Sequence, residues 1–293
     1  MTEILVETVI PIIMFALMFG MGLTLTLVDF RRILQFPRAV LVGLGVQLLV
    51  IPAVGLFIAY EFELSAMLAV GLVAVAASPG GTTSNVVVHV GKGDTPLSIT
   101  LTCSATLATL FTLPLWLSYT LHHFGGTESS IEMPILDSVV QLGIFTIMPV
   151  FLGMIARRFR PKWVDKEPAL TKISFAAMGI AFGLMAFMDG GDVSGDTGKV
   201  VVPTLLLIFS AVVLGFCIPK LSGVSTKSSV TIAVETTLKN LLISLFVAMT
   251  TLNSLEAALP SAVAITVSMP SAFAIMGLYH VVGWLKTQRG ASL

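Results

Sequence analysis

Ser78-Pro79-Gly80-Gly81-Thr82-Thr83-Ser84-Asn85 interrupts a long apolar segment that runs from residue 65 to residue 90. Pro79 lacks a backbone donor and clashes with the preceding turn of a helix, and the two glycines remove the restraint that would continue it. The hydroxyl and amide side chains that follow favour the start of a second helix. We therefore predict a helix broken at membrane depth, a pattern typical of transporter binding sites. A proline kink, with the polar side chains bonded to their own helix, is the alternative.

The composition is that of an integral membrane protein. Of the 293 residues, 56% are hydrophobic and 11% are charged, whereas soluble domains are about 25% charged. The formal net charge of zero gives no general attraction to nucleic acid. We expect one transmembrane unit over residues 1–293, embedded in a lipid bilayer, with no organic cofactor and no obligatory protein partner. Cys103 and Cys217 lie in apolar segments and are expected to be buried core thiols.

Nine segments are long and apolar enough to cross a membrane, which takes about 20 residues of helix. They are Ile4–Val28, Ala39–Tyr60, Ser65–Val90, Thr95–Leu121, Ile135–Ile155, Leu170–Phe187, Val200–Ile218, Ser229–Leu252 and Ala258–Leu285. Glu3 and Glu7 stand where a signal peptide carries positive charge, so the first segment is expected to remain as a span. The predicted fold class is all-α with nine transmembrane helices.

Charge in the connections predicts the orientation. Most of the 16 Lys and Arg residues fall in alternate connections, and the opposite connections are acidic, with Glu128 and Glu132 in one and Asp189, Asp192 and Asp196 in another. Basic connections stay on the cytoplasmic side of a membrane. We therefore predict a multi-pass protein of the plasma (inner) membrane, with its N-terminus outside and its C-terminus in the cytoplasm.

The eighth segment carries two charges at mid-span, Glu235 and Lys239. Each costs about 2.5–3.5 kcal/mol on insertion scales and normally marks function. Their spacing of four residues places both on one face of a helix, where they could pair; a purely structural ion pair is the alternative. Polar interruptions at corresponding places in two oppositely directed halves are typical of an inverted repeat with two discontinuous, crossing helices.

The chain resembles the bile acid:sodium symporter family, and in particular its bacterial homologues of the apical sodium-dependent bile acid transporter. The resemblance covers nearly the whole chain. It is carried by Met18–Leu25, Gln47 five residues before Pro52, Pro79–Asn85, Leu97-Ser98 with Thr102, and Glu235 with Asn240. It implies two inverted repeats that build a core domain, about 39–121 and 200–285, and a panel domain, about 4–28 and 135–187. The chain would match the nine-helix members of the family.

The resemblance also implies the site residues. The first sodium ion would bind at Ser84, Asn85, Ser98, Thr102 and Glu235, because hard oxygen ligands suit a hard cation. A second would use Gln47, Glu235, carbonyls near Thr236 and Leu238, and the residue at position 239. Residues expected to contact substrate are Thr82, Thr83, Thr236 and Asn240.

Two positions depart from the family pattern: Lys239 replaces a glutamine and Thr237 replaces a glycine. A sodium ion about 4 Å from an ammonium group loses about 4 kcal/mol at an effective dielectric constant of 20, which is roughly three orders of magnitude in affinity. We hypothesise that the Lys239 ammonium replaces the second sodium ion. In two alternatives, Lys239 loses its proton during transport and adds proton coupling, or it extends to the surface.

The leading functional hypothesis is a secondary transporter of a small organic anion, bile-acid-like or a smaller carboxylate, and not an enzyme. Sodium-coupled symport is expected, and a sodium-independent or proton-coupled transporter of the same fold is the alternative. Gly91-Lys92-Gly93-Asp94 matches the Gly-x-Gly-Asp pattern of intramembrane aspartyl proteases, but that chemistry needs a second carboxylate at the same site. A channel lacks an evident ring of selectivity residues here. The related arsenite exporters use a cysteine in the first broken helix, where this chain has none.

Overall fold

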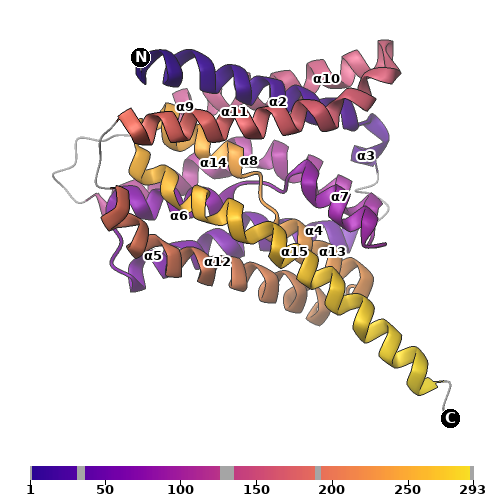
Figure 1. Cartoon of the computed structure of the whole chain (residues 1–293). Helices are drawn as coiled ribbons and strands as arrows, with labels where there is room; N and C mark the ends of the chain where they lie inside the picture. Colours follow the sequence, from indigo (N-terminus) through magenta and orange to yellow (C-terminus); the bar gives the residue numbers. More distant parts are fainter. Residues whose placement is uncertain (1, 32–36, 126–134, 189–192, 291–293) are drawn as a thin grey trace.

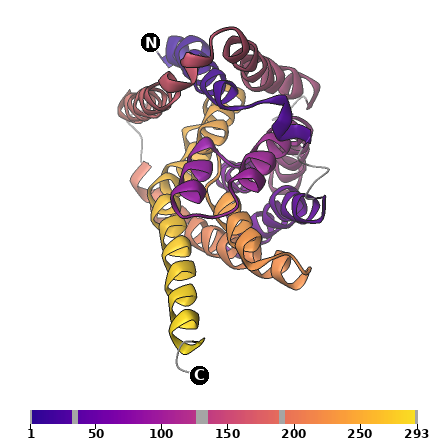
Figure 2. The same ribbon diagram turned by 90° about the vertical axis from the view of Figure 1, so that its right-hand side faces the viewer.

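The computed structural model describes residues 2–31, 37–125, 135–188 and 193–290, and these residues fold into helices that run roughly side by side (Figure 1). Figure 2 shows the bundle nearly end-on. Within the described ranges, seven helices are long and apolar enough to cross a membrane. The all-helical class predicted from the sequence is therefore confirmed.

Several of the continuous spans are assembled from consecutive helical pieces. The first consists of α1 (Thr2–Ile4), the π-helical η1 (Leu5–Val9) and α2 (Ile10–Thr24), and the second of α4 (Pro37–Gly45), the π-helical η3 (Val46–Val50) and α5 (Ile51–Glu61). The others are α8 (Thr95–Phe124), α9 (Ile135–Leu142) with the π-helical η4 (Gly143–Ile147) and α10 (Met148–Phe159), the 3-10 helix η5 (Pro161–Lys166) with α11 (Glu167–Met188), α12 (Val193–Leu221) and α15 (Leu255–Gly290).

Proline explains where three of the π-helical stretches lie. Pro11, Pro52 and Pro149 are each the second residue of the α-helix that follows η1, η3 and η4. A proline inside a helix has no N–H and its ring clashes with the carbonyl four residues earlier. A π-helical turn inserts one residue and moves that carbonyl aside. The chain therefore continues through each proline without ending the span.

The first span is shorter than predicted. The segment Ile4–Val28 was expected to be continuous, but α2 ends at Thr24 and a separate helix, α3 (Leu27–Arg31), follows. Asp29 holds the start of α3, because its Oδ2 accepts from both the backbone N–H and the Oγ1 of Thr26, at 2.8 Å and 2.6 Å. The Asp29 carboxylate thus satisfies a backbone N–H at the start of α3, as the residue three positions after the N-cap does in a capping box.

Two segments are broken helices. α6 (Ala66–Ala77) and α7 (Thr82–Val90) flank an unwound stretch at 78–81, and α13 (Thr226–Thr237) and α14 (Leu241–Phe246) flank another at 238–240. The π-helical η6 (Val247–Thr251) continues α14. The sequence predicted the first break from Pro79-Gly80-Gly81. The second break has no proline or glycine in it, so tertiary contacts must impose it.

The helices pack in two groups. α2 packs against α10 and α11, whereas α6 packs against α5, α8 and α15, and α12 packs against α13 and α15. A Cβ atom at Gly22 would collide with the Val150 carbonyl, so α2 and α10 touch backbone to backbone. Small residues permit such close helix contacts in a membrane. Met14, Leu113 and Phe246 belong to one buried cluster that joins the two groups.

The outer surface is apolar, as lipid requires. Large exposed side chains occur on five different helices, at Phe57, Phe111, Phe151, Phe209 and Phe273, each more than half exposed. In a soluble protein such a surface would drive association, but in a bilayer it faces hydrocarbon. The predicted acidic residues Glu128, Glu132, Asp189 and Asp192 lie outside the described residues.

One cysteine assignment is wrong. Cys103 is buried on α8, as predicted, but Cys217 is exposed on α12. The reason is that an apolar residue in a membrane helix is equally stable facing lipid or facing protein. Hydrophobicity alone therefore did not predict burial for Cys217.

Candidate functional site

The two unwound stretches lie side by side near the centre of the bundle. Gly81 N donates to Leu238 O at 3.1 Å, and Asn240 N donates to Pro79 O at 2.7 Å. These two bonds form an isolated antiparallel bridge between Gly80 and Lys239. Backbone groups that the breaks release from their helices are thus satisfied by each other, which membrane depth demands.

The Glu235 carboxylate lies directly beneath this bridge. Glu235 is completely buried near the end of α13. Ser84 on α7 donates its hydroxyl hydrogen bond to Glu235 Oε2, and Thr102 on α8 donates to Glu235 Oε1. The consecutive helices α7 and α8 therefore meet the distant helix α13 at one carboxylate.

Asn85 and Ser98 extend the same polar cluster. Ser98 Oγ donates to Asn85 Oδ1 at 2.7 Å, and Thr102 Oγ1 lies 3.4 Å from that same oxygen. The structure thus brings together the five residues predicted for the first cation site: Ser84, Asn85, Ser98, Thr102 and Glu235. Their oxygens form a compact group with one formal negative charge when Glu235 is ionised, which is the chemistry that hard cations prefer.

Gly80 makes room for the carboxylate. A Cβ atom at position 80 would lie 2.9 Å from Glu235 Oε2 and 3.0 Å from Oε1. At the neighbouring Gly81, a Cβ would meet nothing closer than Thr83 Oγ1 at 3.4 Å. The close approach of the Glu235 carboxylate therefore explains why position 80 is a glycine. Position 81 has more room for a side chain.

Lys239 contacts a different part of the bundle from Glu235. Its side chain is 7% exposed, and Nζ donates to the Gln47 carbonyl in η3 at 3.4 Å. The prediction that Glu235 and Lys239 share one helical face is wrong, because α13 ends at Thr237, before the lysine. Burial also excludes the alternative in which Lys239 extends to the surface.

Pro52 explains why the Gln47 carbonyl is open to Lys239. In η3 the Ile51 N–H donates to Val46 O, five residues earlier. The next donor in that register would be residue 52, but proline has no N–H. The Gln47 carbonyl is left without a helical donor and accepts from Lys239. The Leu48 carbonyl, four residues before Pro52, accepts from Trp116 Nε1 at 2.9 Å.

Two buried amide side chains near the breaks have polar atoms without partners. Within the described part of the chain, Gln47 Oε1 and Nε2 and Asn240 Oδ1 are buried and make no hydrogen bond. Buried polar groups are nearly always paired, and exceptions mark strain or a ligand site. Both residues belong to the predicted sites.

The residues predicted to contact substrate lie in two different places. Thr82 and Thr83 are half-buried in the first turn of α7, where Gly81 provides no side-chain cap, and Gly81 lies close to Asn240. Thr236 is directed elsewhere: its hydroxyl donates to Ile232 O at 2.7 Å, and its Cβ faces Gly215 on α12. The structure places Thr82, Thr83 and Asn240 together and Thr236 apart.

Sequence reasoning missed a threonine-lined cavity between the two helix groups. Thr106 and Thr109 on α8 face Thr146 in η4, and Ile243 of α14 completes the wall. Among the described residues, the buried Thr146 hydroxyl has no partner. The signal was available, since Thr102, Thr106 and Thr109 are spaced as one face of a helix.

Asp94 has a structural position. It caps α8 by accepting from Leu97 N at 3.3 Å, and its other oxygen accepts from Ser228 Oγ at 3.0 Å. No group of three or more His, Cys, Asp or Glu side chains that could hold a metal occurs within the described ranges. The aspartate of the Gly-x-Gly-Asp pattern therefore caps α8 and links it to Ser228 in the first turn of α13.

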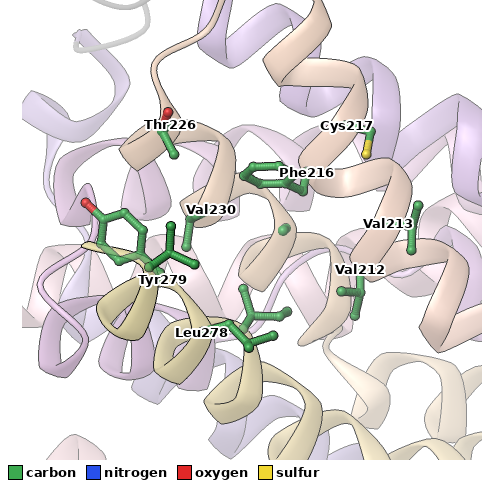
Figure 3. Close-up of a pocket in the computed structure, with 11 residues that line it drawn as sticks. Val212, Val213, Phe216, Cys217, Thr226, Val230, Leu278 and Tyr279 are labelled. Carbon is green, nitrogen blue, oxygen red and sulfur yellow. The ribbon is translucent and has the colours of Figure 1, made fainter. Parts of the chain in front are cut away.

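A separate apolar cavity lies between α12, α13 and α15 (Figure 3). Val212, Phe216, Val230 and Leu278 line it, and Thr226 and Tyr279 lie at its edge. Glu235 and Lys239 are not among its lining residues. This cavity is distinct from the polar cluster.

Fold and site together define a membrane protein in which two broken helices enclose a buried, carboxylate-centred polar cluster. The family described as Sodium Bile acid symporter family matches residues 11–196. The chain belongs to this family, which confirms the resemblance stated from its motifs.

Curated relatives agree with this assignment. The chain is 31% identical over 245 residues to the Bacillus subtilis "Uncharacterized sodium-dependent transporter YocS", covering 80% of this chain and 72% of that protein. It is 30% identical over 255 residues to the rice "Probable sodium/metabolite cotransporter BASS2, chloroplastic", covering 85% and 58%. It is 27% identical over 244 residues to the human "Ileal sodium/bile acid cotransporter", covering 81% and 68%. The chain thus spans about six tenths of the length of the chloroplastic relatives.

Proposed function

We propose that this protein is a sodium-coupled secondary transporter of a small organic anion, either bile-acid-like or a smaller carboxylate. The observation that carries the proposal is the convergence of Ser84 and Thr102 on buried Glu235, beside the Ser98–Asn85 pair. Family membership supports it, as do the names of the relatives, which are transporters or cotransporters rather than enzymes.

In this proposal the chain crosses the membrane nine times. The seven continuous spans and the two broken helices together account for the nine segments predicted. The packing groups support a core of residues 39–121 and 200–285 and a panel of residues 4–28 and 135–187. Inverted repeats would relate the two broken helices, which run in opposite directions and meet at their breaks.

Sodium would bind at Ser84, Asn85, Ser98, Thr102 and Glu235. Hydroxyl groups both donate and accept, so Ser84 and Thr102 can turn their hydrogens away and present oxygen to a cation. The Glu235 carboxylate would supply the compensating charge. The anionic substrate would lie by Thr82, Thr83 and Asn240, where the uncapped N-terminus of α7 offers positive partial charge.

Lys239 would take the place of a second sodium ion. Its ammonium group already meets the Gln47 carbonyl and lies beside the unpartnered Gln47 side chain. The Lys239 ammonium group would satisfy the Gln47 oxygens in place of a sodium ion bound from solution. Transport would then be coupled to one sodium ion.

Thermal stability of the purified chain in detergent tests this proposal without a known substrate. It is measured in NaCl against matched KCl and choline chloride for wild type, Glu235→Gln and Lys239→Gln. Specific binding to the folded state at 100 times Kd stabilises by about 2.7 kcal/mol. We expect sodium to stabilise wild type, Glu235→Gln to lose the response, and Lys239→Gln to gain a second, weaker binding phase.

Matched charge controls are Glu61→Gln and Lys227→Gln, both exposed outside the cluster. Both should keep the wild-type response. A full wild-type response that Lys239→Gln leaves unchanged would overturn the tethered-cation proposal. If neither wild type nor Lys239→Gln responds to sodium, sodium coupling is wrong and the sodium-independent or proton-coupled alternative replaces it.

A further inference from the structure

A cavity with both cationic and apolar walls lies where α2 turns into α3 against the end of α10. It measures about 460 Å³. Leu25 and Leu27 line it on the side of the α2–α3 turn, Phe151 and Ile155 line it from α10, and Arg157 and Arg158 complete the lining. It is at the end of the bundle where α3 and the end of α10 lie together (Figure 1).

Arg157 is fixed in place at this cavity. One of its terminal nitrogens, Nη1, donates to the Thr24 carbonyl at the end of α2. A guanidinium carries five N–H donors in a planar fork, so the remaining donors are available to an anion. The nearby Asp29 carboxylate accepts from Thr26, is 6% exposed, and does not line the cavity.

The walls extend beyond what an inorganic anion would need. Leu27 is 65% exposed and Phe151 is 59% exposed, which leaves an apolar surface beside the two arginines. Arginine matches phosphate geometry better than lysine does. A phosphate group joined to an acyl chain satisfies both parts of the cavity.

We propose that this cavity binds one acidic phospholipid, with its phosphate on Arg157 and Arg158 and an acyl chain against Leu27 and Phe151. The lipid would join the α2–α3 turn to α10. α3 is itself attached to α8, because Thr100 Oγ1 donates to the Asp29 carbonyl at 3.2 Å. Thr100 is two residues from Thr102, so a bound lipid would stabilise the joint between the α2–α10 group and the helix that carries Ser98 and Thr102.

Native mass spectrometry of the full chain tests the proposal, with phosphatidylglycerol and phosphatidylcholine of equal chain length as probes. Each arginine near a membrane surface contributes about 1 kcal/mol toward an acidic lipid, so we expect Arg158→Gln to weaken phosphatidylglycerol binding about fivefold and Arg157→Gln/Arg158→Gln about 30-fold. Phosphatidylcholine binding should stay unchanged. Arg160→Gln/Lys162→Gln removes two charges of the same connection that do not line the cavity, and should keep wild-type binding.

Arg158→Gln keeps the result interpretable if loss of the Arg157–Thr24 bond prevents folding, because Arg158 is exposed. Equal losses in the Arg158 variant and in the Arg160/Lys162 pair would show a diffuse basic surface and overturn the site. Inorganic phosphate that displaces phosphatidylglycerol at equal concentration would show an anion site without a lipid, and would also overturn the proposal.

Discussion

At the residue scale, the polar cluster depends on how closely a carboxylate approaches a backbone. The Glu235 carboxyl group packs on Gly80, and the hydroxyls of Ser84 and Thr102 hold it there. An ionised carboxylate buried in this way is costly unless hydrogen bonds or a cation compensate it. The position of Glu235 therefore matters as much as its charge.

Gly80→Ala should displace this carboxylate. Overpacking costs about 1–3 kcal/mol, so we expect sodium affinity to fall by about 5- to 150-fold, measured as the NaCl concentration that gives half of the thermal stabilisation. Gly81→Ala is the matched control, since its added methyl group meets only ordinary contacts. Equal effects of the two substitutions would show that backbone freedom, and not space for Glu235, governs the cluster.

Individual residues differed in how well the sequence predicted them. Ser84, Asn85, Ser98, Thr102 and Glu235 were assigned by motif, and they do lie together. Thr236 is next to Glu235 in sequence but faces α12, because successive helical residues point about 100° apart. The direction of the Lys239 side chain depends on where α13 ends. The sequence around Thr237 contains no proline or glycine that would predict that end.

At the element scale, Pro52 leaves a backbone carbonyl of the second span free to accept a hydrogen bond from Lys239. Pro52 leaves the Gln47 and Leu48 carbonyls to Lys239 and Trp116. The spacing of Gln47 and Pro52 was visible in the sequence, but a π-helical turn could not be distinguished there from a simple kink. Its form depends on partners from α8 and from the unwound stretch that follows α13.

Pro52→Ala should allow residue 52 to donate within its own helix and so compete with Trp116 for Leu48 O. In a protein that retains Trp116 as its only tryptophan, the emission maximum should shift as the indole N–H loses its acceptor. Pro11→Ala is the control, because Pro11 follows η1 in the same way but is in another span. An unchanged Trp116 spectrum in Pro52→Ala would contradict this account of η3.

At the scale of the whole molecule, the positions of the seven continuous spans were predictable from the sequence and their internal shapes were not. Hydropathy detects apolar segments long enough to cross a membrane, and seven of the predicted segments are continuous spans in the structure. The end of α2 at Thr24, the π-helical turns and the second break depend on caps, prolines and contacts between segments distant in sequence. Hydropathy also does not predict which spans pack together, such as α2 with α10 and α11.

The orientation can be tested directly. Single cysteines at Glu61 and Lys162, both exposed, are introduced in a Cys217→Ser background. Because basic connections stay in the cytoplasm, an impermeant maleimide should label Glu61→Cys in intact cells and Lys162→Cys only after permeabilisation. Labelling of Lys162→Cys in intact cells would reverse the proposed orientation.

The contrast between the two native cysteines makes the wild-type chain a ready-made reporter. Cys217 stands on the outer wall of α12, open to a lipophilic thiol reagent, while Cys103 is 1% exposed beside Thr102. Cys217 should therefore react at once, and Cys103 only when α8 parts from its neighbours. The rate of the slow phase would report how often α8 separates from its neighbours in the unaltered protein. A slower rate in sodium than in potassium would show that sodium stabilises the closed core.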